Sequence, residues 1–193
     1  MSAAAEIAAV AARLVVDEGM EYAGAKRKAA RDFGGRPELP SNEQLEAAVR
    51  AHIEIFCADT QPAELLALRE VALLWMQRLA DFRPHLSGAA WRGTATRLSS
   101  VHLDLYCDDT KAAEIAVING GVAYDVGSLE RPGREPLSVL SVSSASAALG
   151  EPVTVHLLLH DADEQRGALK PDAGGRSWRG NAAALQRLMA AAP

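Results

Sequence analysis

The sequence has little of what marks membrane and secreted proteins. Of its 193 residues only two are cysteine, and 5% are aromatic. No stretch approaches the roughly 20 consecutive apolar residues that a membrane-spanning helix needs, so we expect no membrane association. The N-terminal stretch MSAAAEIAAVAARL has neither the basic start nor the long apolar run of a signal peptide. These absences predict a cytoplasmic protein.

Several enzyme signatures are also missing. There is no GxxxxGK[ST] loop, no GxGxxG after a strand-like run and no GxSxG turn. These absences argue against a P-loop kinase or ligase, a dinucleotide oxidoreductase and an α/β-hydrolase. Cys57 falls on a helix-like segment and Cys107 on a strand-like one. We expect two free, buried thiols, as in a reducing compartment, because neither has an activating context.

Basic residues are in the minority. The chain has 20 lysines and arginines against 25 aspartates and glutamates, which gives a net charge of -5. Nucleic-acid binding depends on a basic face that neutralises phosphates, so the charge argues against nucleic acid as the main partner. A chain of this length suits one domain with a helical extension and buries roughly two-thirds of its surface without disulfides or a structural metal.

The first part of the chain has helical periodicity. Residues 3–33 are alanine-rich with an interruption at Gly19, which predicts two helices or one broken helix. Ser41 and Gln44 form a capping box before an apolar stripe that ends at Phe56. A further apolar stripe stops at Pro84. We therefore predict a helical N-terminal region at 1–83, whose surface is a candidate site for a protein partner.

From residue 84 the apolar pattern changes to period two. Strands are predicted for HLSGAAWRG, SVHLDLYC, VAYDVGSL, LSVLSVSS and PVTVHLLLH. A short helix, DTKAAEIAVING, separates the second strand from the third, and SWRGNAAALQRLMA closes the chain as a helix. This order predicts an α+β domain at 84–193, a mixed sheet with flanking helices.

One stretch of this domain, GAAWRGTATRLSSVHLDL at 88–105, carries a specific pattern. Gly88 ends the first strand, an RGTA turn follows at 92–95, and apolar positions then alternate from Val101 to Leu105. The pattern resembles the nucleotidyltransferase superfamily, the fold of polymerase β-like enzymes. The resemblance covers about residues 62–160. It implies a nucleotidyltransferase-like fold and transfer of a nucleoside monophosphate from a nucleoside triphosphate to an acceptor.

The resemblance also implies magnesium or another divalent metal, held by carboxylates that bridge it to phosphate oxygens. The family has aspartates two apart on the second strand, where this chain has Ser100 and His102. Its third carboxylate falls at Thr154 or His156. If the register shifts by two residues, His102 and Asp104 become the catalytic and metal-binding pair.

Phosphate contacts can be expected from the turn. The nucleotide-binding candidates are Gly88, Arg92, Gly93, Thr94, Arg97 and Ser100. The guanidinium groups of Arg92 and Arg97 suit phosphate oxygens, and in the shifted register Gly93 and Thr94 form the phosphate-contacting pair. Asp125, centred in the third predicted strand, is a further candidate for catalysis or for an ion pair.

A different constellation competes with this one. Residues two apart on a strand share a face, so His102 lies with Asp104, and His156 with Thr154 and His160. If the two strands are neighbours, His102, Asp104 and His156 could bind zinc or ferrous iron. Three readings stay open: an active nucleotidyltransferase with an altered metal site, a non-catalytic nucleotide- or protein-binding module of that fold, and a His/Asp metal-dependent enzyme.

Overall fold

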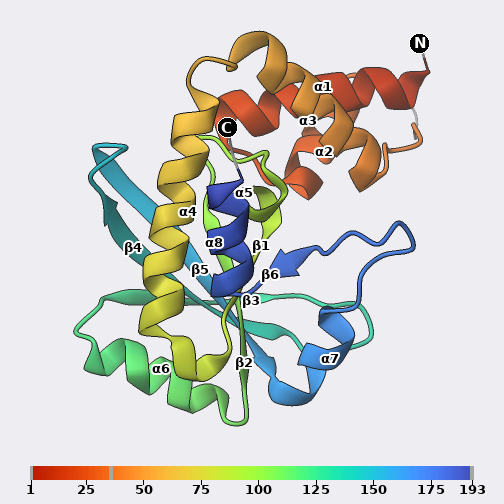
Figure 1. The fold of residues 1–193 in the computed structure, drawn as a ribbon. Coiled ribbons are helices and arrows are strands. Elements are labelled where there is room, and N and C mark those ends of the chain that lie inside the picture. Colours follow the sequence, from red (N-terminus) through yellow and green to blue (C-terminus); the bar gives the residue numbers. More distant parts are fainter. Residues whose placement is uncertain (1, 35–36, 192–193) are drawn as a thin grey trace. The chain divides into compact units, whose positions relative to one another are not determined.

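The computed structural model describes residues 2–34 and 37–191 and divides into two compact units (Figure 1). The first unit comprises Met1–Leu65 with Thr94–Ser99, and the second comprises Leu66–Gly93 with Ser100–Pro193. The boundary predicted between residues 83 and 84 lies inside the second unit and stays a prediction. None of the helices in the described ranges is both long enough and apolar enough to cross a membrane.

The first unit is built from α1 (Ala3–Glu18), α2 (Tyr22–Ala30), α3 (Asn42–Phe56) and the start of α4 (Gln61–Arg78). Gly19 ends α1 in the left-handed conformation at φ 66°, which glycine adopts without steric cost. The capping box of Ser41 and Gln44 is present at the start of α3, as predicted. Ile7, Leu45 and Val49 are fully buried in the core that these helices share.

One core prediction in this unit is wrong. The apolar stripe of α3 predicts a buried Phe56, but the side chain of Phe56 is 70% exposed. The helix ends at this residue, and Ile53 is the last buried position on its stripe. The neighbouring Ile55 is equally exposed. The protein partner predicted for these helices stays a prediction.

Within the described residues the second unit has a six-stranded sheet of order β3-β4-β5-β2-β1-β6. Strands β2 and β5 pair in parallel, and each other neighbouring pair is antiparallel. The strands are β1 (His85–Ser87), β2 (Val101–Cys107), β3 (Tyr124–Leu129), β4 (Leu137–Ser146), β5 (Glu151–Asp161) and β6 (Arg179–Gly180). The expected α+β class with a mixed sheet is thereby confirmed.

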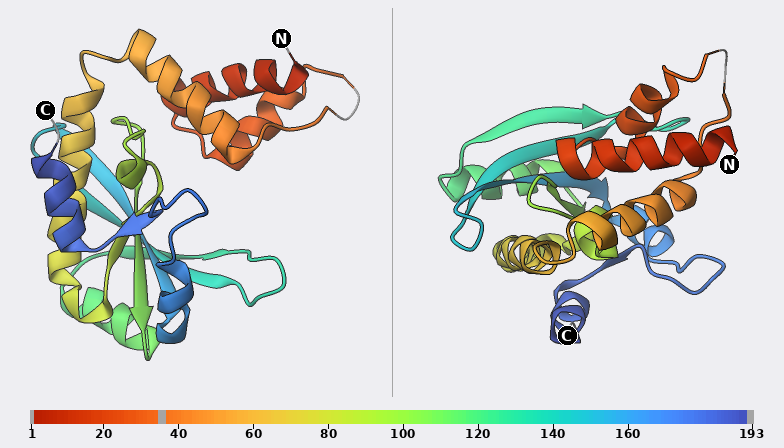
Figure 2. Two further views of the ribbon diagram at one scale, coloured as in Figure 1. Left: turned by 45° about the vertical axis from the view of Figure 1, so that its right-hand side comes forward. Right: turned by 90° about the horizontal axis from the view of Figure 1, so that it is seen from above.

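The helices of this unit lie along the sheet. Besides α4 they are α5 (Gly88–Arg92), α6 (Thr110–Asn119), α7 (Gln165–Ala168) and α8 (Ala182–Ala190), with the 3₁₀ turns η1 (Ala80–Phe82) and η2 (Ala162–Glu164). Figure 2 shows α4 and α8 on one side of the sheet. The face toward them is apolar: Val101, Leu103 and Leu105 of β2 alternate along this face and are fully buried. The opposite face carries the intervening side chains, among them His102.

The first predicted strand is much shorter than expected. The sequence predicts one strand for HLSGAAWRG, but β1 stops at Ser87 and residues 88–92 form α5. Gly88 has φ 69°, which turns the chain out of the extended conformation. Arg69 then fixes the short helix, because its buried guanidinium donates to the carbonyl oxygens of Ala90 and Trp91 at 3.0 and 3.4 Å.

Candidate functional site

The open face of the sheet carries a row of polar side chains, one from each strand. Directly paired residues on neighbouring strands point to the same face, and the pairing continues from edge to edge. The polar row consists, in strand order, of Asp125, Ser141, His156, His102, Ser87 and Arg179. Each of the other five strands therefore contributes one side chain to the row that contains His102.

Two histidines stand at the centre of the polar row. The imidazole rings of His102 and His156 have centroids 5.1 Å apart and are tilted by 40°. Ser141 Oγ lies 2.8 Å from His156 Nδ1, which fixes the orientation of that ring. Strands β2 and β5 are neighbours, which was the condition for His102 and His156 to come together. The side chains of His102 and His156 are thus adjacent imidazoles on neighbouring strands.

Gly88 lies directly against this pair. A Cβ atom at Gly88 would stand 3.4 Å from His102 Nδ1. The backbone at the start of α5 therefore lies within van der Waals distance of the imidazole, and its φ of 69° favours glycine at this position. Ser100, half-buried, immediately precedes β2. Gly88, one of the predicted nucleotide-binding residues, therefore lies against His102.

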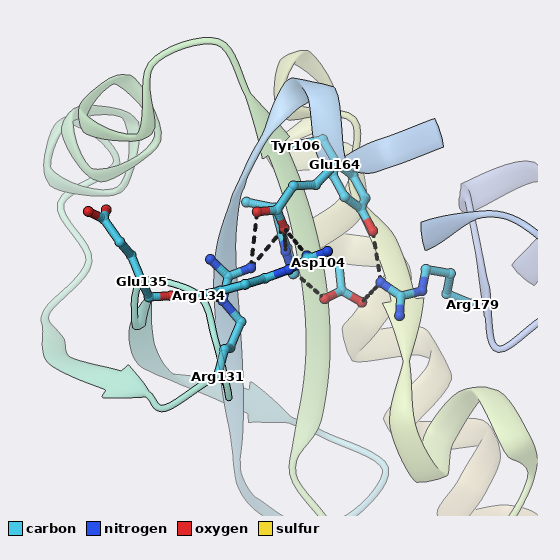
Figure 3. Close-up of polar contacts among 8 residues, drawn as sticks. Asp104, Tyr106, Arg131, Arg134, Glu135, Glu164 and Arg179 are labelled. Carbon is cyan, nitrogen blue, oxygen red and sulfur yellow. Dashed lines mark hydrogen bonds and ion pairs between the residues drawn. The ribbon is translucent and has the colours of Figure 1, made fainter. Parts of the chain in front are cut away.

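Asp104, the next residue on this face of β2, points into a different group of contacts (Figure 3). Its side chain is buried, with 3% of the residue exposed. Asp104 Oδ1 lies 2.6 Å from His160 Nε2, and Asp104 Oδ2 lies 3.3 Å from Arg179 Nη1. Burial alone would raise the pKa of Asp104, but the hydrogen bond with His160 and the charge of Arg179 lower it below its ordinary value. Asp104 is therefore an ionised, paired carboxylate.

The contacts of the buried Asp104 extend into a half-buried charge network, which we define as Asp104, His160, Glu164, Arg131 and Arg179. His160 Nδ1 lies 3.2 Å from Glu164 Oε2. Arg131 Nη1 donates to both oxygens of Glu164 at 2.8 and 3.1 Å. Ionised carboxylates only accept hydrogen bonds, so His160 donates from both ring nitrogens when both bonds form.

The network changes the pKa values of two side chains, Glu164 and Tyr106. Burial alone would raise the pKa of Glu164, but the hydrogen bonds with His160 and Arg131 hold it below its ordinary value. Tyr106 stacks on His160 with ring centroids 5.1 Å apart, and its hydroxyl accepts from Arg179 Nη1 at 2.8 Å. Burial raises the pKa of this tyrosine, and the charge of Asp104 raises it further. The network pairs opposite charges, although Asp104 Oδ2 and Arg179 Nε make no hydrogen bond within the described residues, and it links β2, β5, η2, β6 and the β3–β4 connection.

The predicted phosphate contacts are divided between the two units. Gly88, Arg92, Gly93 and Ser100 belong to the second unit, whereas Thr94 and Arg97 belong to the first. Thr94 is buried, with 2% exposure. The backbone N–H of Arg97 donates to Glu64 Oε2 at 2.9 Å. Gly93 ends α5 in the left-handed conformation at φ 84°. The role of this set in nucleotide binding stays a prediction.

The donor atoms near His102 do not fit magnesium. Magnesium prefers hard oxygen ligands in an octahedron, whereas His102 and His156 offer imidazole nitrogens and Ser100 offers a hydroxyl. No cluster of three or more His, Cys, Asp or Glu side chains in the described ranges is arranged to hold a metal ion. The structure brings His102 and His156 together, but Asp104 turns to His160 and Arg179 instead of completing the predicted metal set.

The thiols offer no nucleophile. Cys57 and Cys107 are both free, as expected, but only Cys107 is buried and the expected burial of Cys57 is wrong, since its side chain is partly exposed. Burial raises the pKa of the Cys107 thiol to about 11. Burial also raises the pKa of Cys57. Nucleophilic cysteines need the opposite shift.

Sequence reasoning missed several members of these groups. Arg179 comes from the two-residue strand β6, where the sequence wrongly predicted the start of the closing helix, which begins only at Ala182. Arg131 comes from a connection expected to be a simple turn. Ser141 and Ser87 join the polar row only through the strand pairing. The sequence did indicate that His156 and His160 lie on one face of their strand. The residues that contact them could not be identified, because that depends on the order of the strands in the sheet.

The comparisons with known proteins add little. No protein-family model matches the chain. No curated protein matches it. A similar solved structure carries the description "Structural Basis for the Activity of a Cytoplasmic RNA Terminal U-transferase", with 16% sequence identity and a TM-score of 0.37. The match covers 56% of this chain and 36% of that chain, and a similarity this low assigns no activity.

Proposed function

We propose that this protein is nucleotidyltransferase-like and binds the phosphates of a nucleoside triphosphate at the polar row, without magnesium-dependent transfer. The observation that supports this proposal is the adjacency of His102 and His156 on the open face, with ring centroids 5.1 Å apart. These imidazoles stand where the sequence resemblance implies metal-binding carboxylates. The proposal also rests on the turn at 88–95, whose residues were predicted to contact phosphate.

Phosphate binding suits the groups of the polar row. Imidazole N–H groups and serine hydroxyls donate hydrogen bonds to phosphate oxygens. Ser87 and Ser141 flank the two histidines on either side, and Arg179 stands beside Ser87. The close backbone approach at Gly88 leaves no side chain between α5 and His102. An anionic ligand therefore meets donors across four neighbouring strands.

Transfer chemistry suits this face poorly. In-line transfer uses divalent ions that stabilise the attacking and leaving oxygens, and carboxylates must hold those ions. The nearest carboxylate on the strand of His102 is Asp104, which is already paired with His160 and Arg179. Recruiting Asp104 to a metal would break its pairing with the half-buried His160 and Arg179, which costs stability because Asp104 itself is buried.

The role of the polar row can be tested by calorimetric titration of the full chain with ATP, UTP and inorganic tripolyphosphate in the presence of EDTA. We expect binding to wild-type protein that weakens roughly tenfold or more in His102→Ala and in His156→Ala, because each substitution removes a phosphate donor. His52→Ala, a histidine of α3 beside Asp17, is the matched control and should bind like wild type.

Two results would contradict the proposal. The first is the absence of heat with any of the three ligands. The second is binding that is unchanged in both polar-row variants, which would move the site elsewhere on the chain. Thermal melts of each variant show whether a loss of binding reflects a loss of folding.

A further inference from the structure

A small pocket lies beside the polar row on the side of β3. It has a volume of about 260 Å³. Apart from Tyr124, whose hydroxyl donates to Glu114, its polar lining consists of Asp125, Ser141, Ser143 and Thr154, and we call it the hydroxyl pocket. Three of these four residues carry hydroxyl groups and the fourth carries a carboxylate. Such a lining offers many hydrogen bonds and a single negative charge.

The strand register aims these side chains to one face. Ser143 pairs with Thr154, Ser141 pairs with His156, and Asp125 pairs with Ser141. All of them therefore share the open face with His102 and His156. Asp125, Ser143 and Thr154 are exposed, and Ser141 is half-buried through its contact with His156. The hydroxyl pocket is thus continuous with the proposed phosphate site through Ser141.

The chemistry of the lining selects a class of ligand group. A carboxylate repels phosphate but accepts hydrogen bonds from the hydroxyls of a sugar, as the acidic residue of dinucleotide-binding domains does with a ribose hydroxyl. The surrounding hydroxyl groups can both donate to and accept from further sugar oxygens. The preferred occupant is therefore an uncharged, polyhydroxylated ring.

We infer that the hydroxyl pocket binds the ribose of a ribonucleotide whose phosphates lie on His102 and His156, with Asp125 accepting from the ribose hydroxyls. This inference rests on the proposed function. Asp125 and His156 lie two strands apart, about 10 Å. A ribose with its 5′-phosphate bridges such a span when each end makes a hydrogen bond. The inference makes this face selective for ribonucleotides over 2′-deoxyribonucleotides.

The test compares ATP, 2′-deoxy-ATP and inorganic tripolyphosphate by calorimetry on the full chain. Wild-type protein should bind ATP roughly tenfold or more tightly than 2′-deoxy-ATP, because a lost hydrogen bond to a charged acceptor has about that effect. In Asp125→Asn this preference should largely disappear, while the affinity for tripolyphosphate stays as in wild type. Asp163→Asn, an exposed aspartate of η2, is the matched control and should keep the preference.

The outcomes separate this inference from the proposed function. Equal binding of ATP and 2′-deoxy-ATP by the wild type, or a preference that survives in Asp125→Asn, overturns the ribose assignment. If tripolyphosphate still binds in that case, the proposed phosphate site stands. If tripolyphosphate and both nucleotides fail to bind wild-type protein, both proposals fall. Ser143→Ala provides a second variant, in which a weakened preference again supports the assignment and an unchanged one counts against it.

Discussion

At the scale of single residues, Asp104 shows how a candidate metal ligand becomes a structural group. The sequence places it on the strand face of His102, and the structure confirms that position. Its oxygens, however, are held by His160 and Arg179. Both partners are far away in the sequence. A carboxylate buried in this way stabilises the fold only while its partners remain.

The pairing of Asp104 predicts a defined dependence on pH. Because the pKa of Asp104 in the folded protein lies below its ordinary value of 3.8, its contribution is complete above that pH and is lost as the pH falls through the lowered value. Asp104→Asn should therefore lower the free energy of unfolding by about 3 kcal/mol at neutral pH. The difference from wild type should stay constant down to about pH 5 and shrink below 3.8.

Urea unfolding at several pH values measures this difference. Asp163→Asn serves again as the control, because this exposed aspartate belongs to none of the described pairs of the network. If the difference in free energy of unfolding between wild type and Asp104→Asn grows as the pH falls, Asp104 is not held as an ionised, paired group.

Residue types and strand faces in the candidate site could be predicted, but their partners could not. His102, His156 and Asp104 were recognised from their spacing of two on apolar strands. Whether two such strands are neighbours depends on the sheet order. In this sheet β2 lies next to β5, although β3 and β4 separate them in the sequence. The ring contact between His102 and His156 follows from that order, not from local sequence.

At the scale of elements, the shortest strand depends on one close contact. Gly180 of β6 faces the ring of Trp91, and a Cβ atom at this position would overlap the ring. The indole Nε1 of Trp91 also donates to Ser177 O at 2.8 Å, so the ring cannot move away without losing a hydrogen bond. Glycine at 180 therefore permits the pairing of β6 with β1.

Gly180→Ala should lower the free energy of unfolding by about 1–3 kcal/mol, the usual effect of overpacking. The matched control is Gly167→Ala in α7, where a Cβ atom would meet no neighbour within 4 Å. Guanidinium denaturation of the two variants tests the contact directly. Equal stability of the two variants would mean that the Trp91 ring yields freely.

Elements with a long periodic pattern were predicted well, and those with a short pattern were not. The helices α1 to α4 and the strands β2 to β5 carry several turns or several alternations each. Strand β6 has two residues, which is too few to show any period. Helix α5 was hidden because Gly88 changes the backbone direction within a run of small apolar residues.

At the scale of the whole molecule, the sheet of the second unit separates stability from the candidate function. One face is apolar and covered by helices, and the other carries the polar row, the hydroxyl pocket and the charge network around Asp104. The period of two in the strands made this two-sided arrangement predictable. How the strands align their polar residues into one row was not predictable, because register depends on pairing across the sheet.

The polar row is proposed to bind a triphosphate without the aid of a metal. The most direct measurement is the affinity of the full chain for ATP in EDTA and in magnesium, with the products of each incubation analysed for released pyrophosphate. We predict binding in EDTA that magnesium leaves equal or weaker, and no pyrophosphate. Binding that requires magnesium, or release of pyrophosphate that is lost in Asp104→Ala, would refute metal-free binding and restore the reading as an active nucleotidyltransferase.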